Sequence, residues 1–231
     1  MAPQFAAILL DFYGTVVGED DAAIRQICRQ VAAASPLATT AAQVGSWWAR
    51  AFRALCGISH GSAFRRQREL ERLSLQQVLE QAEADLDADA LSQPMYAYWT
   101  RPEPFPESRW VLARCPVPIC LVSNIDTADL QQALAHVGLR FDHVVTSEDC
   151  RAYKPHPAPF ERALSLLGLP PSHALHVGDS WGSDVVGAQA AGIPVLWINR
   201  RLRPIPDGGS PPTLMAPDLT GLLADRRSGR Q

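Results

Sequence analysis

The chain has 231 residues, of which 47% are hydrophobic and 19% are charged, and its formal net charge is −3. A chain of this size can bury a full core, either as one large domain or as one domain with an insertion. Because the charge is nearly balanced, it excludes a protein that depends on a strongly basic surface, and we expect no nucleic-acid partner.

The N-terminal segment and the cysteines indicate the compartment. The apolar stretch that ends at residue 10 has no basic residue before it and is too short to cross a membrane. The five cysteines show no CxxC spacing, which is typical of reduced thiols in a cytosolic protein. We therefore expect a soluble, cytoplasmic protein with no membrane partner.

The first predicted element is a strand over residues 6–10, where five apolar residues stand in a row. Such a run is typical of a strand buried on both faces of a parallel sheet. Asp11 follows directly, and Gly14 allows the chain to turn sharply beside it. Open α/β sheets hold ligands at the carboxyl ends of their strands, so Asp11 is a candidate nucleophile or metal ligand. The alternative is a strand that ends in an ordinary Asp/Gly turn.

Residues 19–99 show helical periodicity and little strand signal. Apolar residues recur at spacings of three and four in stripes that include Ile24, Trp47 and Leu70. A helical stretch this long exceeds a simple crossover between strands. It ends at residues 101–106, where three prolines mark a boundary. We therefore predict a helical cap at 18–100, inserted into a core made of 1–17 and 101–231.

A basic concentration lies inside the predicted cap, at residues 65–68. Glu69 and Glu71 interleave with these basic residues and with Arg72. The mixed signs predict a solvated helix face rather than a nucleic-acid patch.

After the boundary, strands and helices alternate. Strands are predicted at 118–122, 143–146, 174–177 and 194–198, and helices at 128–137, 158–167 and 184–191. This order is typical of a doubly wound, Rossmann-like parallel sheet with helices on both faces. Residues 203–213 are rich in Pro and Gly and are expected to be irregular, before a last short helix near 219–223.

Four sites with polar side chains fall at strand ends or helix starts of this sheet. They are Asp11; Ser123 with Asn124, where Asp126 is placed to cap the next helix; Lys154; and Asp179 with Asp184. Each has an ordinary structural explanation as a turn, cap or surface residue. Taken together, however, paired carboxylates suit Mg²⁺, and Ser123 and Lys154 suit an oxyanion. The set matches what phosphoryl transfer needs.

At these four sites the sequence resembles the haloacid dehalogenase-like superfamily of hydrolases, and the helical insertion is similar to that family's small cap. The resemblance implies that Asp11 is a covalent nucleophile and that Ser123 and Lys154 bind the transferred group. It also implies that Asp179 is an Mg²⁺ ligand, and that Asp184 holds metal-bound waters or orients Lys154.

Tyr13 makes the subclass ambiguous. Most phosphatases of this superfamily carry an acid/base aspartate at that position, whereas Asp-x-Tyr-Gly-Thr and the pair Ser123-Asn124 resemble metal-independent 2-haloacid dehalogenases. Phe160 and Asp179 depart from the dehalogenase pattern. The backbone carbonyl of Tyr13 can still bind metal, and its phenol, with a pKa near ~10, can donate a proton but is a poor base.

Charge favours the phosphatase, because a second carboxylate helps to hold the cation that a phosphate dianion needs and would repel a haloacid. We expect an Mg²⁺-dependent phosphatase that acts on a small anionic metabolite; the alternatives are a 2-haloacid dehalogenase and a non-catalytic binding protein. Thr15, Asn124 and Arg53 are the predicted substrate-binding residues. Arg53 shares its helix with Trp47, Trp48 and Phe52, a group that core packing also explains.

Overall fold

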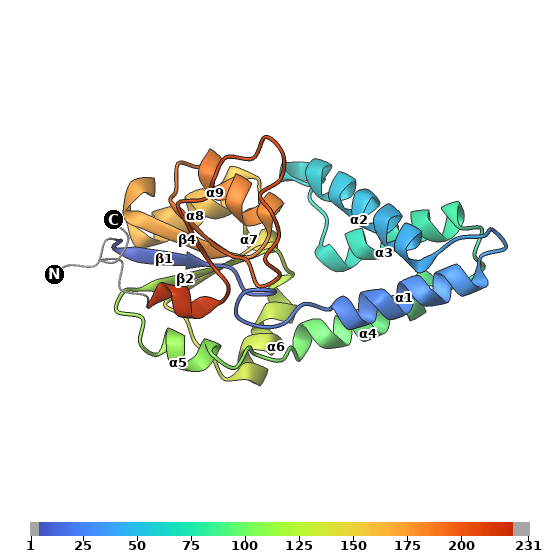
Figure 1. Cartoon of the computed structure of the whole chain (residues 1–231), viewed down its shortest axis with the longest axis horizontal. Helices are drawn as coiled ribbons and strands as arrows, with labels where there is room; N and C mark the ends of the chain where they lie inside the picture. Colours follow the sequence, from blue (N-terminus) through green and yellow to red (C-terminus); the bar gives the residue numbers. More distant parts are fainter. Residues whose placement is uncertain (1–4, 224–231) are drawn as a thin grey trace.

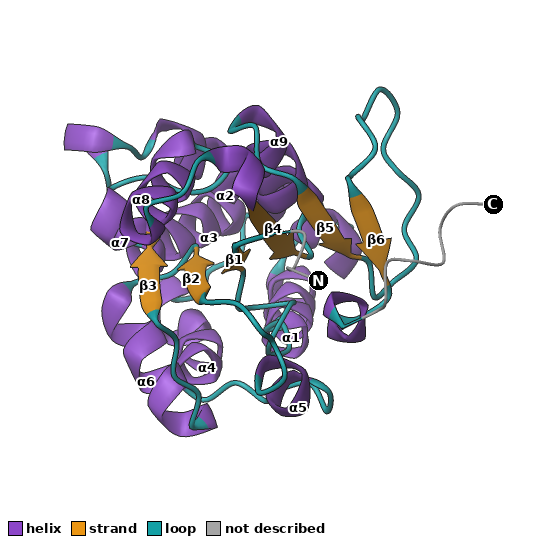
Figure 2. Cartoon of the chain, turned by 90° about the vertical axis from the view of Figure 1, so that its left-hand side faces the viewer, coloured by secondary structure: helices purple, strands orange, loops and turns teal. Residues whose placement is uncertain are grey.

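A computed structural model describes residues 5–223. Its centre is a parallel sheet of six strands in the order β3-β2-β1-β4-β5-β6 (Figures 1 and 2). The strands are β1 (Ala7–Leu10), β2 (Ile119–Ser123), β3 (His143–Thr146), β4 (Ala174–Gly178), β5 (Val195–Ile198) and β6 (Leu214–Ala216). The predicted doubly wound α/β fold is confirmed.

β1 lies inside the sheet and fixes its register. Leu10 is paired with Leu121 of β2 on one side and with Val177 of β4 on the other. All four residues of β1 are buried, as expected for a strand covered on both faces. The buried residues form two hydrophobic clusters, and adjacent residues of β1 pack in different ones. Leu10 packs in one cluster and Leu9 in the other. The carboxyl ends of β1, β2 and β4 therefore meet at one edge.

Helices cover both faces of the sheet (Figure 2). α8 and α9 lie on one face, and α5 and α6 lie on the other. The bounds are α5 (Ser108–Leu112), α6 (Thr127–Val137), α7 (Ser147–Cys150), α8 (Pro157–Leu167) and α9 (Val186–Ala190). The chain also forms a π-helical turn, η3 (Trp181–Val185), and three short 3₁₀ turns: η1 (Gly61–Ala63), η2 (Pro171–His173) and η4 (Leu219–Leu222).

Four further helices stand beyond the carboxyl edge of the sheet and are called the cap helices below (Figure 1). They are α1 (Asp21–Ala34), α2 (Ala41–Ile58), α3 (Gln67–Gln81) and α4 (Ala88–Thr100). All four fall within the residues that the sequence assigns to a cap. The division into core and cap at 18–100 stays a prediction.

The C-terminal part differs from the prediction in three places. β6 was not predicted, because it has only three residues and Ala216 alone is buried. The expected last helix is the 3₁₀ turn η4. The helix predicted at 184–191 is divided, since the π-helical turn η3 leads into a shorter α9. Residues 1–4 and 224–231 of the predicted core lie outside the described residues.

Candidate active site

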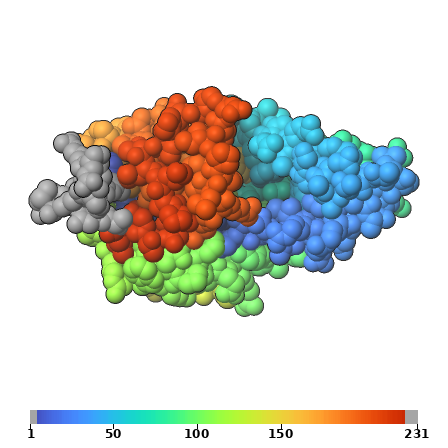
Figure 3. Space-filling model, in the orientation of Figure 1, coloured from blue at the N-terminus to red at the C-terminus, as the bar shows by residue number. Residues whose placement is uncertain are grey.

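A cavity of about 330 Å³ lies between the carboxyl edge of the sheet and the cap helices. Figure 3 shows the surface hollowed between the orange core segments and the cyan helix region. The core contributes residues that follow β1, β2 and β4, residues of η3, and Lys154 from the loop before α8. They are Asp11, Tyr13, Ser123, Asn124, Ile125, Lys154, Asp179, Ser180, Ser183 and Asp184. The cap side contributes Glu19, Asp20, Ile24, Gly45, Trp48, Ala49, Phe52, Gln67, Glu71 and Trp99.

Lys154 joins two carboxylates on the core side. Its Nζ lies 2.8 Å from Asp11 Oδ1 and 2.6 Å from Asp184 Oδ1. Burial acts to lower the pKa of Lys154, but the charges of Asp11 and Asp184 outweigh it and raise the pKa above its usual value. For Asp184, Lys154 and His176 overcome the effect of burial and hold the pKa of the carboxyl below its usual range. The ammonium and the Asp184 carboxylate are therefore both charged at neutral pH.

The surrounding residues hold Lys154 and Asp184 in place. The Asn124 amide accepts from Lys154 N at 2.7 Å and donates to Lys154 O at 3.0 Å. His176, whose pKa is lowered by burial, donates from Nε2 to Asp184 Oδ1 at 2.9 Å. Ser180 N donates to Asp184 Oδ2 at 2.9 Å. Both amide atoms of Asn124 bind the backbone of Lys154, so Asn124 positions the lysine; its role in binding substrate stays a prediction.

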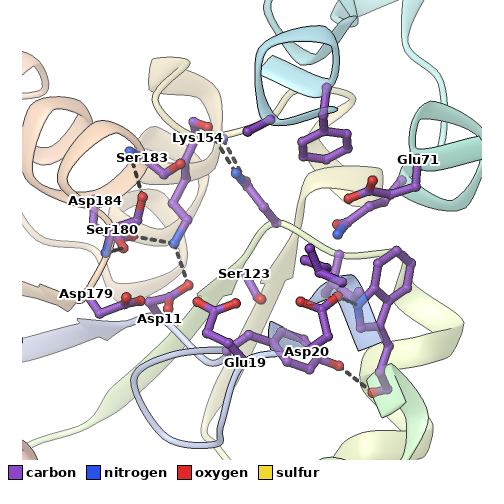
Figure 4. Close-up of a pocket in the computed structure, with 18 of the residues that line it drawn as sticks. Asp11, Glu19, Asp20, Glu71, Ser123, Lys154, Asp179, Ser180, Ser183 and Asp184 are labelled. Carbon is purple, nitrogen blue, oxygen red and sulfur yellow. Dashed lines mark hydrogen bonds and ion pairs between the residues drawn. The ribbon is translucent and has the colours of Figure 1, made fainter. Parts of the chain in front are cut away.

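Three carboxylates form a candidate metal site on this side (Figure 4). One oxygen from each of Asp11, Asp179 and Asp184 lies within 4.8 Å of the other two. Burial, reinforced by the charges of Asp11 and Asp184, raises the pKa of Asp179 to about 8. Burial also raises the pKa of Asp11 to about 6, against the opposing charge of Lys154. The site is short of positive charge, and a hard divalent cation with oxygen ligands fits this donor set.

Two glycines allow these carboxylates to approach the backbone. Gly14 has φ +83°, and a Cβ there would lie 2.4 Å from Asp179 Oδ1. A Cβ at Gly178 would lie 2.3 Å from Asp184 Cγ. Only glycine fits at either position without moving a site carboxylate.

Tyr13 lines the cavity, but its hydroxyl is engaged elsewhere. The phenol donates to the carbonyl of Trp99, at the end of α4, at 2.5 Å. Burial raises the pKa of Tyr13 above its usual value, and nearby carboxylates act in the same direction. A phenol with a raised pKa and an occupied proton is a poor acid, so the geometry does not support the predicted proton-donor role. Ser123, in contrast, ends β2 beside Asp11 with its side chain facing the cavity (Figure 4).

Three residues do not lie where the sequence-based assignments place them. Thr15 is fully buried and does not line the cavity. Arg53 is exposed, because the face of α2 that reaches the cavity carries Gly45, Trp48, Ala49 and Phe52, and Arg53 points away from it. Asp126 does not cap α6; its carboxylate accepts from Gln67 N at 2.7 Å and Arg68 N at 3.2 Å, and so caps α3.

The acidic residues of the cap side are not among the site residues predicted from the sequence. The sequence predicts Glu71 on a solvated helix face, but the residue is 8% exposed and lines the cavity. Its spacing from Ser74, Leu75 and Val78, all buried, places it on the buried stripe of α3 and was the available signal. Asp20, just before α1, accepts from Trp99 Nε1 at 2.8 Å.

Within residues 5–223, none of the helices has the length and apolarity needed to cross a bilayer. Two solved structures share the fold. The L-2-haloacid dehalogenase RSc1362 has a TM-score of 0.79 at 23% identity, covering 96% of this chain and 98% of that one. The HAD-hydrolase YfnB from Bacillus subtilis, bound to magnesium, has a TM-score of 0.73 at 19% identity, covering 95% and 97%.

Curated relatives differ in activity. The chain is 36% identical over 122 residues to an (S)-2-haloacid dehalogenase of Pseudomonas sp. (strain YL), covering 50% of this chain and 51% of the relative. It is 36% identical over 121 residues to a phosphoserine phosphatase of Thermus thermophilus, covering 50% and 48%. The chain thus spans about half the length of these relatives. A family model for haloacid dehalogenase-like hydrolases matches residues 5–192, well over half of the sequence, and the chain belongs to that family.

Proposed function

We propose that this hydrolase is an Mg²⁺-dependent phosphatase that acts on a small phosphorylated metabolite through an aspartyl-phosphate on Asp11. The observation that supports it is the cluster of Asp11, Asp179 and Asp184, whose oxygens lie within 4.8 Å of one another. Lys154 is the only basic side chain among the described residues that line the cavity, and it is already paired with two of these carboxylates.

The charge of the cavity favours a phosphate ester bound with a cation over a haloacid. When bound, Mg²⁺ would neutralise the oxygens of the transferred phosphoryl group beside the three carboxylates. A haloacid brings a carboxylate of its own, and the lining offers it no arginine among the described residues. Six carboxyl side chains line the same cavity: Asp11, Glu19, Asp20, Glu71, Asp179 and Asp184.

The residues of the core side suit an in-line displacement. A carboxylate oxygen of Asp11 forms a bond to phosphorus while the ester P–O bond breaks, and the electron pair leaves with the alcohol oxygen. Lys154 and Ser123 hold phosphoryl oxygens. Water then cleaves the acyl-phosphate, which restores the Asp11 carboxylate and releases inorganic phosphate. Since Tyr13 is a poor acid here, esters with stable leaving groups, such as aryl phosphates, are expected to react faster than alkyl phosphates.

A paired assay tests this proposal against the dehalogenase alternative, which Tyr13 and the dehalogenase relative favour. Release of phosphate from 4-nitrophenyl phosphate is expected to stop with a chelator and to return with added Mg²⁺. Release of halide from 2-chloropropionate that a chelator does not change, without release of phosphate, would refute the phosphatase. Turnover of neither substrate would indicate a binding protein.

A further inference from the structure

The cap side of the cavity differs from the core side, because its carboxyl groups face no basic side chain of the described residues. Glu71 is 8% exposed and points into the cavity from α3 (Figure 4). Burial raises the pKa of Glu71 well above its usual value; the negative charge of Asp20 acts in the same direction, and a hydrogen bond from Trp48 opposes it. No basic side chain in residues 5–223 forms an ion pair with Glu71. Apart from the hydrogen bond from Trp48, this buried carboxyl has no cationic partner among the described residues.

Aromatic side chains surround the same space. Trp48 and Phe52 line the cavity from α2, and Trp99 lines it from α4. The indole of Trp48 donates to Ser74 Oγ at 2.9 Å, and that of Trp99 donates to Asp20 Oδ2 at 2.8 Å. These bonds hold two of the ring systems beside the two carboxyl groups. Aromatic rings combined with carboxylates are a favourable environment for an organic ammonium group.

The two sides of the cavity then select different parts of one substrate. If the phosphoryl group lies at Asp11 and Lys154, the leaving group extends toward Glu71 and Asp20, on the opposite side in Figure 4. A second anionic group there would meet two carboxyl groups and no cation among the described residues to pair with it. A cationic group would provide the missing partner.

We propose that Glu71, with Asp20 and the rings of Trp48, Phe52 and Trp99, forms a subsite for a protonated or quaternary amine on the leaving group of the substrate. The substrate class is a small phosphate monoester that carries an ammonium group. This inference rests on the proposed phosphatase function and adds the nature of the leaving group to it.

The test compares isosteric substrates in the presence of Mg²⁺. Phosphoethanolamine is compared with propyl phosphate, and phosphocholine with 3,3-dimethylbutyl phosphate, so that each pair differs mainly in the positive charge. The kcat/KM of the native enzyme is expected to be at least roughly tenfold higher for the cationic member of one pair, as a charge-assisted contact of about 1.4 kcal/mol would give. Equal values or a preference for the neutral members would overturn the proposal.

Glu71→Gln gives a second measurement, because it removes the charge and keeps the shape. The preference for the cationic member is expected to fall toward one in this variant. Glu69→Gln is the matched control, since Glu69 lies on the same helix, is half-buried outside the cavity lining and pairs with Arg65. An unchanged preference in Glu71→Gln would refute the role of this residue; if the variant does not fold, the native comparison still decides.

The proposed function and the subsite fail in different ways. If 4-nitrophenyl phosphate is hydrolysed but the charged and neutral members react equally, the subsite is wrong and the phosphatase stands. If halide but no phosphate is released from any compound, the phosphatase itself is wrong, and the subsite proposal falls with it.

Discussion

The two sides of the cavity use the same chemical group in opposite ways. On the core side, the carboxylates of Asp11 and Asp184 are bound to Lys154 at 2.8 and 2.6 Å. On the cap side, Glu71 is equally enclosed by protein but has no cation beside it among the described residues. On the core side, Lys154 supplies the positive charge. On the cap side, the proposed cationic ligand would supply it.

The core side is suited to carrying out the reaction, and the cap side is suited to choosing the substrate. Hydrogen bonds with Asn124, His176 and Ser180 hold Lys154 and Asp184 in place. A catalytic site needs such fixed side chains, because it must position the reacting atoms. The cap groups are held by aromatic residues and leave room for the variable part of a substrate. Variants on the two sides are therefore expected to change different measurements.

The largest effect is expected for Asp11→Asn. An amide of nearly the same shape is a poor nucleophile, so turnover should fall by about 10³-fold or more. The loss should affect kcat with every substrate, measured as release of phosphate or halide. Asp85→Asn, at an exposed position, is the control and should keep native turnover.

An Asp11→Asn variant that keeps more than a few per cent of the native rate would place the nucleophile elsewhere. Thermal unfolding should show that the variant is folded, because Lys154 retains its contact with Asp184.

The core side could be predicted from the sequence because it depends on strand ends. A run of buried residues that ends in Asp11, Ser123 or Asp179 places its polar residue at one edge of a parallel sheet. The same reasoning cannot place the cap side, since the relation of α3 to the sheet is set by tertiary contacts. The bond from the start of α3 to Asp126 spans 59 positions of sequence, and no local pattern predicts it.

The second effect is expected at the contact between the two sides. Tyr13→Phe removes the hydrogen bond to the carbonyl of Trp99 and leaves that carbonyl without its donor, which should destabilise the protein by about 1–3 kcal/mol. Because the phenol is a poor acid here, kcat for 4-nitrophenyl phosphate should change much less than in Asp11→Asn. Urea unfolding and steady-state kinetics measure the two effects, and a 10²-fold loss of kcat would restore the catalytic role that the sequence suggests.

A smaller effect is expected from the cap of α3. Asp126→Ala removes the acceptor for the backbone N–H groups of Gln67 and Arg68, and the loss of a helix cap typically costs about 1 kcal/mol. The midpoint of thermal unfolding should fall by about 2–4 °C, as expected for a chain of this size. This cap holds the start of α3, and α3 carries Glu71 of the proposed amine subsite. The KM for a cationic phosphate ester should therefore rise more than kcat falls. An unchanged unfolding midpoint would contradict this reading of the contact.

The smallest expected effect concerns the pH dependence of stability and bears directly on the uncompensated Glu71. Burial raises the folded-state pKa of Glu71 well above the unfolded value of about 4.3. The unfolded chain therefore loses this proton first as pH rises, and Glu71 opposes folding progressively above that value and up to its folded pKa.

Glu71→Gln removes the penalty, so its gain in unfolding midpoint over the native protein should be larger at pH 8 than at pH 5. Glu69→Gln, on the same helix but outside the cavity, is the control. A gain in Glu71→Gln that is independent of pH would mean that Glu71 is not held protonated by burial. A carboxyl that lowers stability at neutral pH is consistent with a binding role, because a cationic ligand would stabilise the same charge that folding disfavours.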